Sequence, residues 1–407
     1  MINPDRALAA TVRTEGARIL ATLVRTVGSL QVAEDAVQEA ALRALRDWPC
    51  NGVPDEPRAW LTVTARRVAI DLLRREGVRA HKERASVQLA APDLPPDSVV
   101  ADDQLRLIFT CCHPALGLDA QVTLALRTLC GLSPAEIAAV LLTSESAVSK
   151  RLTRTRAKIA RAGIPYRVPA DDELPARLGA VCAVLHASYT IAHSAAGGDQ
   201  LTDVDAAREA LRLARLVHHL MPDETSPMAV LALMLLTESR RAARLDRGGD
   251  PVPLAEQDRS SWDTGAIEEA LYLLDESLRR TGAVADPYQL QAAIAAEHAR
   301  ARSYEATNWP EIVRLYDLLL EVQPSAPAAL ARAVAVAESD GAAAGLRALD
   351  QLVPDQRCLA VRGELLAREG KYSEAVTATR LSLSDLVTAP ERRYRERRIA
   401  DWLAQQG

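Results

Sequence analysis

The stretch LSPAEIAAVLLTSESAVSKRLTRTRAKIARAG, residues 132–163, predicts two helices joined by a short turn. Ser133 is placed to cap the first helix, and Glu136 three residues later completes the pattern of a capping box. We expect the turn at Leu142–Ser144, with Ser144 as the cap of the second helix. The stretch therefore indicates a helix-turn-helix.

The second helix of this stretch has an apolar face and a basic face. A recognition helix packs by its apolar face, reads base edges near its N-terminus and contacts phosphates through basic side chains. A helical hairpin that does not bind DNA is the alternative, but the caps, the spacing and the two faces together favour DNA binding. The apolar positions are Val148, Leu152, Thr155 and Ile159, and the basic positions are Lys150, Arg151, Arg154, Lys158 and Arg161.

An earlier basic segment, PRAWLTVTARRVAIDLLRR at residues 57–75, predicts a helix that Pro57 is well suited to begin. At about 100° per residue, one arc of it combines an indole with guanidinium groups, which suits unstacked bases and phosphates. A solvated charged face is the alternative. The stripe consists of Trp60, Thr64, Arg67, Asp71, Arg74 and Arg75. We expect burial for most of the remaining circumference, which holds Val63, Val68, Ile70, Leu72 and Leu73.

A further helix is predicted at residues 33–47, AEDAVQEAALRALRD, which is alanine-rich and amphipathic. We expect Glu34 and Asp35 in its first turn, where they complement the helix dipole. Prolines predict a linker in ASVQLAAPDLPPDSVVA and a second break in GIPYRVPADDELP. The predicted layout is a helical domain at 1–84, a linker at 85–101, a helix-turn-helix domain at 102–167 and a helical region at 168–407.

Composition favours an all-α fold. The 407 residues include a single Phe and only 3% aromatic residues, so the cores must be built from Ala, Leu and Val, which favours packed helices over sheets. The formal net charge of −5 taken alone argues against a nucleic-acid binder. Residues 1–170, however, hold 23 basic and 18 acidic side chains, whereas residues 171–407 hold 26 and 36. A nucleic-acid surface is therefore expected on the first part.

The order of these segments resembles bacterial RNA polymerase sigma factors of the extracytoplasmic-function (ECF) type, over residues 7–167. The segments are AEDAVQEA, then PRAWL with DLLRR, a proline-rich linker and the basic helix-turn-helix. The resemblance implies two small helical sigma domains that bind RNA polymerase core, through the clamp helices of the β′ subunit and the flap of the β subunit. It also implies promoter DNA as a partner. One difference is Leu142 in the turn, where many relatives carry Gly.

The resemblance assigns three sets of contact residues. For the polymerase core they are Glu34, Asp35, Val37, Gln38 and Ala41. For the minus-ten element, read as a single strand, they are Trp60, Thr64, Arg66, Arg67, Asp71, Arg74 and Arg75. For the minus-thirty-five element, read in the major groove, they are Ser144, Ser146, Ser149, Lys150, Arg151, Arg154 and Lys158.

The rest of the chain resembles the subgroup of these sigma factors with a long C-terminal extension of tetratricopeptide-like (TPR-like) helical repeats. The carrying segments are IFTCCHPAL at 108–116, GIPYRVP at 163–169 and LAEQDRSSWD at 254–263. EGKYSEAVTATRLSL at 369–383 has the spacing of one such helix pair. We expect a regulatory role, by contact within the chain or with an unknown protein. The candidate contact residues are Gln257, Asp258, Arg259 and Trp262, for which an internal ion pair and a Trp anchor are the alternative.

The sequence gives little support for a metal site, an enzymatic activity or a membrane segment. Cys111, Cys112, His113 and Cys130 lack the paired spacing of a zinc site, and Cys182 with His186 has no second pair of ligands, so we expect buried thiols and no metal. We find no phosphate-binding glycine loop and no supported nucleophile–base pair, so we expect no enzyme and no cofactor. No signal sequence or apolar span is evident, and a cytoplasmic protein without membrane contact is expected.

The sequence thus predicts a sigma factor with a fused helical regulatory domain. One alternative is a helix-turn-helix regulator that binds duplex DNA without polymerase and uses the repeats as a sensor. Another is a scaffold whose basic helices are merely solvated, which predicts no salt-dependent affinity for DNA.

Overall fold

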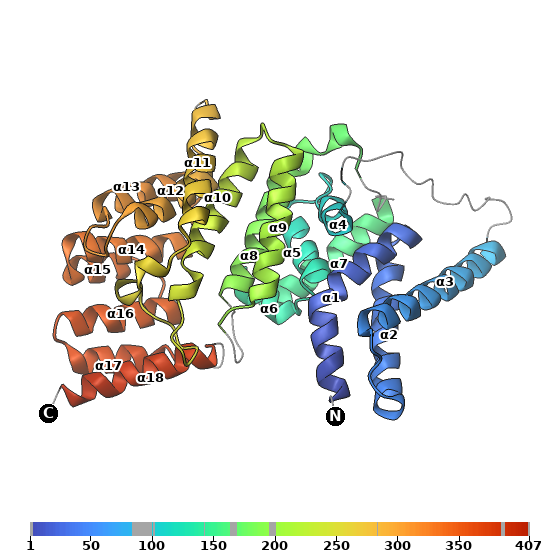
Figure 1. Cartoon of the computed structure of the whole chain (residues 1–407), viewed down its shortest axis with the longest axis horizontal. Coiled ribbons are helices and arrows are strands. Elements are labelled where there is room, and N and C mark those ends of the chain that lie inside the picture. Colours follow the sequence, from blue (N-terminus) through green and yellow to red (C-terminus); the bar gives the residue numbers. More distant parts are fainter. Residues whose placement is uncertain are drawn as a thin grey trace. The chain divides into compact units, whose positions relative to one another are not determined.

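The computed structural model of the chain is built mainly of α-helices (Figure 1). The structure describes residues 3–83, 100, 102–141, 143–162, 169–194, 201–282, 284–383 and 387–405. Within these ranges the only β-type pairing is a single bridge between Leu245 and Pro251. None of the described helices is both long and apolar enough to cross a membrane. The chain divides into two compact units, Met1–Ser188 (unit 1) and Tyr189–Gly407 (unit 2).

Unit 1 contains two groups of helices. The first is α1 (Pro4–Val27), α2 (Leu30–Asn51) and α3 (Pro57–Glu83), and the second is α4 (Asp103–Cys111), α5 (Leu118–Leu129), α6 (Pro134–Val140) and α7 (Glu145–Ala162). Two short 3-10 turns, η1 (Asp171–Glu173) and η2 (Pro175–Arg177), lead into α8 (Leu178–His193), whose first part belongs to unit 1. Helix α1 packs against α2 and α3, and also against α4 and α5 of the second group.

Small side chains let α2 approach its neighbours closely. Ala33, Ala36 and Ala44 are fully buried, and α3 lies along α2. The helix begins at Leu30 because the Ser29 hydroxyl accepts a hydrogen bond from the amide of Val32, at 3.3 Å. The expectation that Glu34 and Asp35 lie in the first turn is therefore wrong, since the helix starts three residues earlier than the sequence pattern indicated.

The helix-turn-helix is confirmed as α6 and α7. The Ser133 hydroxyl accepts from the amide of Glu136, and the Glu136 carboxylate accepts from the amide of Ser133, at 3.2 and 2.7 Å. Ser144 caps α7 by accepting from the amide of Ala147, at 3.2 Å. Leu142 of the predicted turn lies outside the described residues.

Most residues at the predicted domain boundaries lie outside the described part of the chain. Of the linker at 85–101, the structure describes Val100 alone. Residues after the predicted boundary at 167 pack into unit 1: the buried Arg177 guanidinium donates to the carbonyl of Phe109 at 2.9 Å, and Cys130 Sγ donates to Ser188 Oγ at 3.4 Å. The boundaries stay predictions, but residues 169–188 form part of the packed body of unit 1.

Unit 2 is a succession of helices, and from α10 onward each packs on the next (Figure 1). The helices are α9 (Val204–Leu220), α10 (Thr225–Ser239), α11 (Thr264–Arg280), α12 (Pro287–Arg300), α13 (Trp309–Val322), α14 (Ala326–Asp340), α15 (Ala342–Leu349), α16 (Gln356–Arg368), α17 (Tyr372–Leu381) and α18 (Ala389–Ala404). The 3-10 turns η3 (Arg241–Ala243), η4 (Leu254–Glu256) and η5 (Arg259–Ser261) lie between α10 and α11. Alternate helices begin at residues 287, 326, 356 and 389, close to a tetratricopeptide period. The all-α fold with a TPR-like C-terminal region is thereby confirmed.

Close packing within one helix pair depends on a glycine. A Cβ placed on Gly363 of α16 would lie 2.0 Å from Thr379 Oγ1 and 3.2 Å from the carbonyl oxygen of Ala375, both on α17. The turn between these helices is closed by Gly370, whose φ of +74° favours glycine. The segment predicted to be a repeat unit, residues 369–383, thus forms the turn and α17, which packs tightly on the preceding helix α16.

Candidate nucleic-acid interface

The faces of α7 match the sequence pattern. Val148, Leu152, Thr155 and Ile159 are buried against the unit, and the opposite side is open to solvent. The exposed residues of the predicted minus-thirty-five set are Ser144, Ser146, Ser149, Lys150, Arg154 and Lys158. Two lysines, one arginine and three hydroxyls thus form a continuous polar surface along the helix.

Arg151 differs from the rest of this set because other side chains hold it in place. Its guanidinium lies 3.2 Å from the carboxylate of Asp119 and donates to Thr123 Oγ1 at 3.2 Å, and its side chain is 27% exposed. Both partners belong to α5. Arg151 is therefore oriented by its own domain, whereas Arg154 donates to the carbonyl of Lys150, one turn back on α7, at 3.3 Å.

On α3 the charged members of the minus-ten set are exposed, namely Arg66, Arg67, Asp71, Arg74 and Arg75. Trp60 and Thr64 are half-buried. The indole of Trp60 packs edge-to-face on the buried Trp48 of α2, with ring centroids 5.7 Å apart and an interplanar angle of 71°. Trp60 thus anchors the start of α3, and only part of its ring faces solvent.

The expected burial of the apolar positions on α3 is wrong for three of them. Val63 is 50% exposed, and Ile70 and Leu73 are 38% and 37% exposed. Between residues 57 and 75, where the structure describes the side chains, the helix is covered along the face of its buried residues, Leu61, Ala65, Val68 and Ala69. Two of them, Val63 and Ile70, share a helical face with Arg67 and Arg74. Val63, Ile70 and Leu73 are thus surface residues, although the sequence pattern assigned them to the core. The sequence did hold a signal for this, because apolar positions cover more of the helix circumference than one packed face needs.

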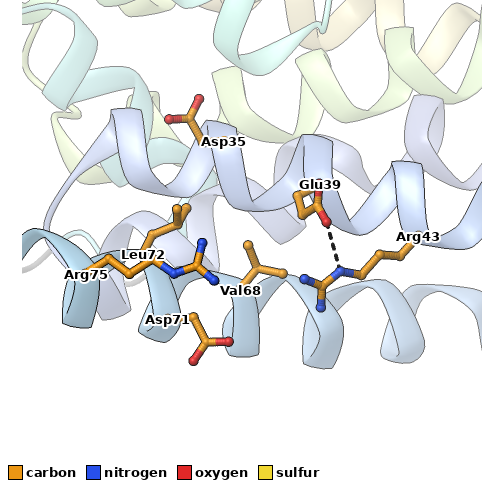
Figure 2. Close-up of a pocket in the computed structure, with 7 residues that line it drawn as sticks. All are labelled: Asp35, Glu39, Arg43, Val68, Asp71, Leu72 and Arg75. Atoms are coloured by element: carbon orange, nitrogen blue, oxygen red, sulfur yellow. Dashed lines mark hydrogen bonds and ion pairs between the residues drawn. The ribbon is translucent and has the colours of Figure 1, made fainter.

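A groove of about 440 Å³ runs between α2 and α3 (Figure 2). Its floor contains Val68 and Leu72, and an ion pair of 3.0 Å joins Glu39 to Arg43 on one wall. The remaining lining residues are Asp35, Asp71 and Arg75. Residues predicted for polymerase and for the minus-ten element therefore line one groove of mixed charge.

The α2 residues that were predicted to contact polymerase differ in their exposure to solvent. Asp35 and Gln38 are exposed, and Val37 and Ala41 are half-buried. On the same face as Gln38, Leu42 and Leu45 are each 47% exposed, and sequence reasoning did not select them. Because they lie beside Gln38 on one exposed face of α2, they are added to the candidate surface.

Glu34, the remaining member, is turned toward α7. Its side chain is 13% exposed, and its carboxylate accepts a hydrogen bond from the guanidinium of Arg156 at 2.9 Å. Burial raises the pKa of Glu34, and the charge of Arg156 acts in the opposite direction. A second ion pair, Arg25 with Asp103 at 3.3 Å, also joins the two helix groups of unit 1.

The cysteines of unit 1 are mostly core residues. Cys111 and Cys112 are buried, and burial raises the pKa of Cys111 to about 12. Cys182 is buried as well, and burial lowers the pKa of nearby His186 to about 4. The expectation of buried thiols is confirmed for Cys111, Cys112 and Cys182, while Cys130 is only partly buried.

In unit 2 the candidate regulatory segment is largely used inside the chain. Arg259 donates to the carbonyls of His298 and Ala301 and lies over the ring of the buried Trp262, 4.7 Å from its centroid. Gln257 donates to the carbonyl of Val252 at 3.0 Å. Asp258 is exposed. These contacts agree with the alternative that the segment anchors Trp262 inside the chain. A contact of this segment with a partner protein stays a prediction.

Known proteins match the chain in several parts. A family model for Sigma-70 region 2 matches residues 11–79, and one for Sigma-70 region 4 matches residues 106–159. A family of unknown function (DUF6596) matches residues 177–278. An uncharacterized protein of Rhizobium meliloti is 38% identical over 402 residues, which cover 92% of this chain and 91% of that protein.

Two sigma factors of Mycobacterium tuberculosis are also similar. The probable ECF RNA polymerase sigma factor SigI is 30% identical over 178 residues, 42% of this chain and 60% of SigI. The ECF RNA polymerase sigma factor SigJ is 33% identical over 177 residues, 40% of this chain and 55% of SigJ. With both sigma regions matched in order and a helical region of more than 200 residues after them, the chain belongs to the ECF sigma factors of bacterial RNA polymerase, in the group with a long TPR-like C-terminal extension.

Proposed function

We propose that this sigma factor binds core RNA polymerase through the exposed face of α2 and directs initiation at a promoter read by α3 and α7. The observation that carries the proposal is the arrangement of two exposed basic faces, on α3 and α7, each backed by a buried apolar face. Such faces bind nucleic acid through phosphates, and the sigma regions matched here supply the family context.

Helix α7 would enter the major groove of the minus-thirty-five element. Its N-terminal part, capped by Ser144, carries Ser146 and Ser149, which can donate or accept hydrogen bonds at base edges. Lys150, Arg154 and Lys158 would then contact phosphates along the flanks. Arg151, held by Asp119, would present its guanidinium in a fixed direction.

Helix α3 would contact the opened minus-ten strand. Arg67 and Arg74 supply positive charge for the backbone, and Val63 and Ile70 supply apolar surface on which an unpaired base can rest. No covalent step is needed, because binding the single strand in preference to the duplex favours promoter opening.

The pairing of α2 with α7 has a consequence for this function. The minus-ten and minus-thirty-five elements lie about 25 base pairs apart, which is roughly 85 Å along the duplex. The contact between Glu34 and Arg156 holds the two helix groups together. Unit 1 would therefore have to open before α3 and α7 reach both elements, and polymerase binding to α2 would compete with Arg156 for Glu34.

The C-terminal unit would regulate this opening. Residues 171–407 carry an excess of acidic side chains, whereas residues 1–170 carry an excess of basic ones. An acidic body on the same chain can lower the affinity of the basic faces for DNA through electrostatic attraction that is screened by salt.

In vitro transcription with core RNA polymerase over a library of random promoters tests the proposal. We expect the purified chain to direct initiation from a subset sharing two elements, and K150Q together with R154Q to abolish this while R347Q, an exposed arginine of unit 2, leaves it intact. Failure to copurify with core polymerase, combined with salt-dependent binding to duplex DNA, would instead favour the polymerase-independent regulator. Absence of both activities would favour the scaffold.

A further inference from the structure

A short hairpin between η3 and η4, residues 244–252, is held together by its own hydrogen bonds; we call it the Asp250 hairpin. The amide of Asp246 donates to the carbonyl of Asp250 at 3.0 Å, and the amide of Val252 donates to the carbonyl of Arg244 at 2.8 Å. The Asp246 carboxylate also accepts from the amide of Asp250, at 3.0 Å. The shape of the hairpin therefore depends little on the helices around it.

One arm of the Asp250 hairpin reaches α18, the last helix of unit 2 (Figure 1). The carboxylate of Asp250, whose side chain is 7% exposed, accepts a hydrogen bond from Arg393 Nε at 2.8 Å and another from Arg397. The two arginines stand one turn apart on α18, and their side chains are 49% and 53% exposed. They thus form a site for a carboxylate that is open to solvent on one side.

The stretch that follows the hairpin connects α18 with the start of the repeats. Arg259 donates to the carbonyl of Ala301, directly after α12, at 2.8 Å. Between the two contacts, Glu256 lies near Tyr394 of α18: burial first, and then nearby carboxylates that include Glu256, raise the pKa of Tyr394 to about 12. Residues 244–259 therefore bridge α12 and α18. Proteins built from helical repeats bind their partners on surfaces formed by successive repeats, and here a segment of the chain itself spans them.

The part of α18 that holds the hairpin is basic. Residues 391–398 contain five arginines and two glutamates, a net charge of +3, although residues 171–407 together hold 26 basic and 36 acidic side chains. Arg398 is used within the repeats, because it pairs with Glu364 on α16 at 2.8 Å. Glu396 is exposed on the same helix and, among the described residues, pairs with neither of the arginines that hold the hairpin. This stretch is therefore a positive patch in an acidic part of the chain.

We propose that Arg393 and Arg397 are a docking site for an acidic, extended segment of a partner protein, and that the Asp250 hairpin occupies this site in the free chain. The hairpin keeps its own hydrogen bonds when it leaves, and half of each arginine side chain is already in solvent. A protein segment is favoured over nucleic acid because the site already holds a carboxylate and the acidic excess of residues 171–407 repels a polyanion. The inference rests on the proposed regulatory role of unit 2 and gives that role a class of partner.

The test measures the binding of a fluorescein-labelled hexaglutamate peptide to the full chain by fluorescence anisotropy at low salt, without polymerase or promoter. D250N removes the charge of the hairpin and frees both arginines. Because a ligand tethered to its site competes at an effective concentration on the order of 1 mM, we expect D250N to bind the peptide about tenfold more tightly than the wild type. R393Q together with R397Q should abolish saturable binding. R347Q, the matched control on α15, should bind as the wild type does.

A second variant leaves Asp250 and both arginines in place. D246A removes the acceptor that holds the hairpin turn, so it should also tighten peptide binding, by less than D250N does. If the melting temperature shows that D250N does not fold, D246A decides. The proposal is overturned if the deciding variant binds the peptide no more tightly than the wild type, or if the double arginine variant still binds it saturably. Tighter binding of a labelled thymidine oligonucleotide of equal charge would overturn it as well. None of these results bears on promoter recognition, because neither polymerase nor promoter is present.

Discussion

The guanidinium of Arg156 on α7 donates a hydrogen bond of 2.9 Å to the carboxylate of Glu34 on α2, across 122 positions of sequence. One residue stands on the helix that would read the minus-thirty-five element, and the other was expected to contact polymerase. The Glu34 side chain is 13% exposed, so its charge depends on this partner. The pair therefore couples access to α2 with the position of α7.

Breaking this pair should open unit 1. R156Q leaves Glu34 without its counter-charge, and a destabilisation of the closed arrangement by about 1 kcal/mol would tighten binding to core polymerase about fivefold. Fluorescence anisotropy of the labelled chain titrated with core measures this. R161Q, which removes an exposed arginine of the same helix, is the control and should not change affinity. Equal or weaker binding by R156Q would contradict the coupling, whereas no binding by the wild type would contradict the function.

The phosphate contacts of α7 should appear in the salt dependence of DNA binding. R154Q removes an exposed guanidinium, so the slope of log affinity against log salt should fall in magnitude by about 0.9. D119N leaves Thr123 as the remaining partner of Arg151, so the guanidinium is held less firmly, and binding to the selected promoter should weaken more than binding to unrelated duplex. Anisotropy titrations over a salt series measure both. An unchanged slope in R154Q would remove that residue from the interface.

The exposed apolar residues of α3 should matter for promoter opening and little for folding. V63S and I70S change half-exposed side chains, so each should alter the free energy of unfolding by less than about 0.5 kcal/mol. Both should reduce the rise in 2-aminopurine fluorescence that reports strand opening at the minus-ten element. V68A, in the buried face, is the contrasting control and should cost about 1–2 kcal/mol of stability. Normal opening by both serine variants would refute the role.

Buried histidines should make unit 2 sensitive to acid. Burial, with Arg240 and Arg259, lowers the folded-state pKa of His298 to about 4, below the ordinary 6.5 of the unfolded chain. The stability this provides is complete above pH 6.5 and is lost as the pH falls toward 4, by up to about 1.4 kcal/mol per pH unit. Urea unfolding across this range should show a shallower slope in H298N. H219Q, at an exposed histidine, should retain the wild-type slope.

Packing of the α16–α17 pair should tolerate no methyl group at Gly363. The added Cβ would lie 2.0 Å from Thr379 Oγ1, so G363A should destabilise unit 2 by about 1–3 kcal/mol. At Gly179 in α8 nothing lies within 4 Å, and G179A should be neutral or stabilising by up to about 1 kcal/mol. Thermal unfolding of the two variants compares them directly. Equal stability would show that the two helices can move apart at little cost.

What the sequence by itself determined was local. The capping box of Ser133 and Glu136, the cap at Ser144 and the two faces of α7 follow from hydrogen bonds and periodicity within about thirty residues, and the structure confirms them. The helix pair around Gly370 was likewise readable, because its turn requires a residue that accepts positive φ.

The tertiary structure alone decided which surfaces are free. Periodicity shows that α3 has apolar positions but not how wide a face its neighbours cover, so Val63 and Ile70 were assigned to the core although they face solvent. Nor does spacing reveal pairs between distant helices. Glu34 with Arg156, and Arg151 with Asp119, depend on how the helices pack, because side chains far apart in sequence meet only where burial of apolar surface brings their helices together.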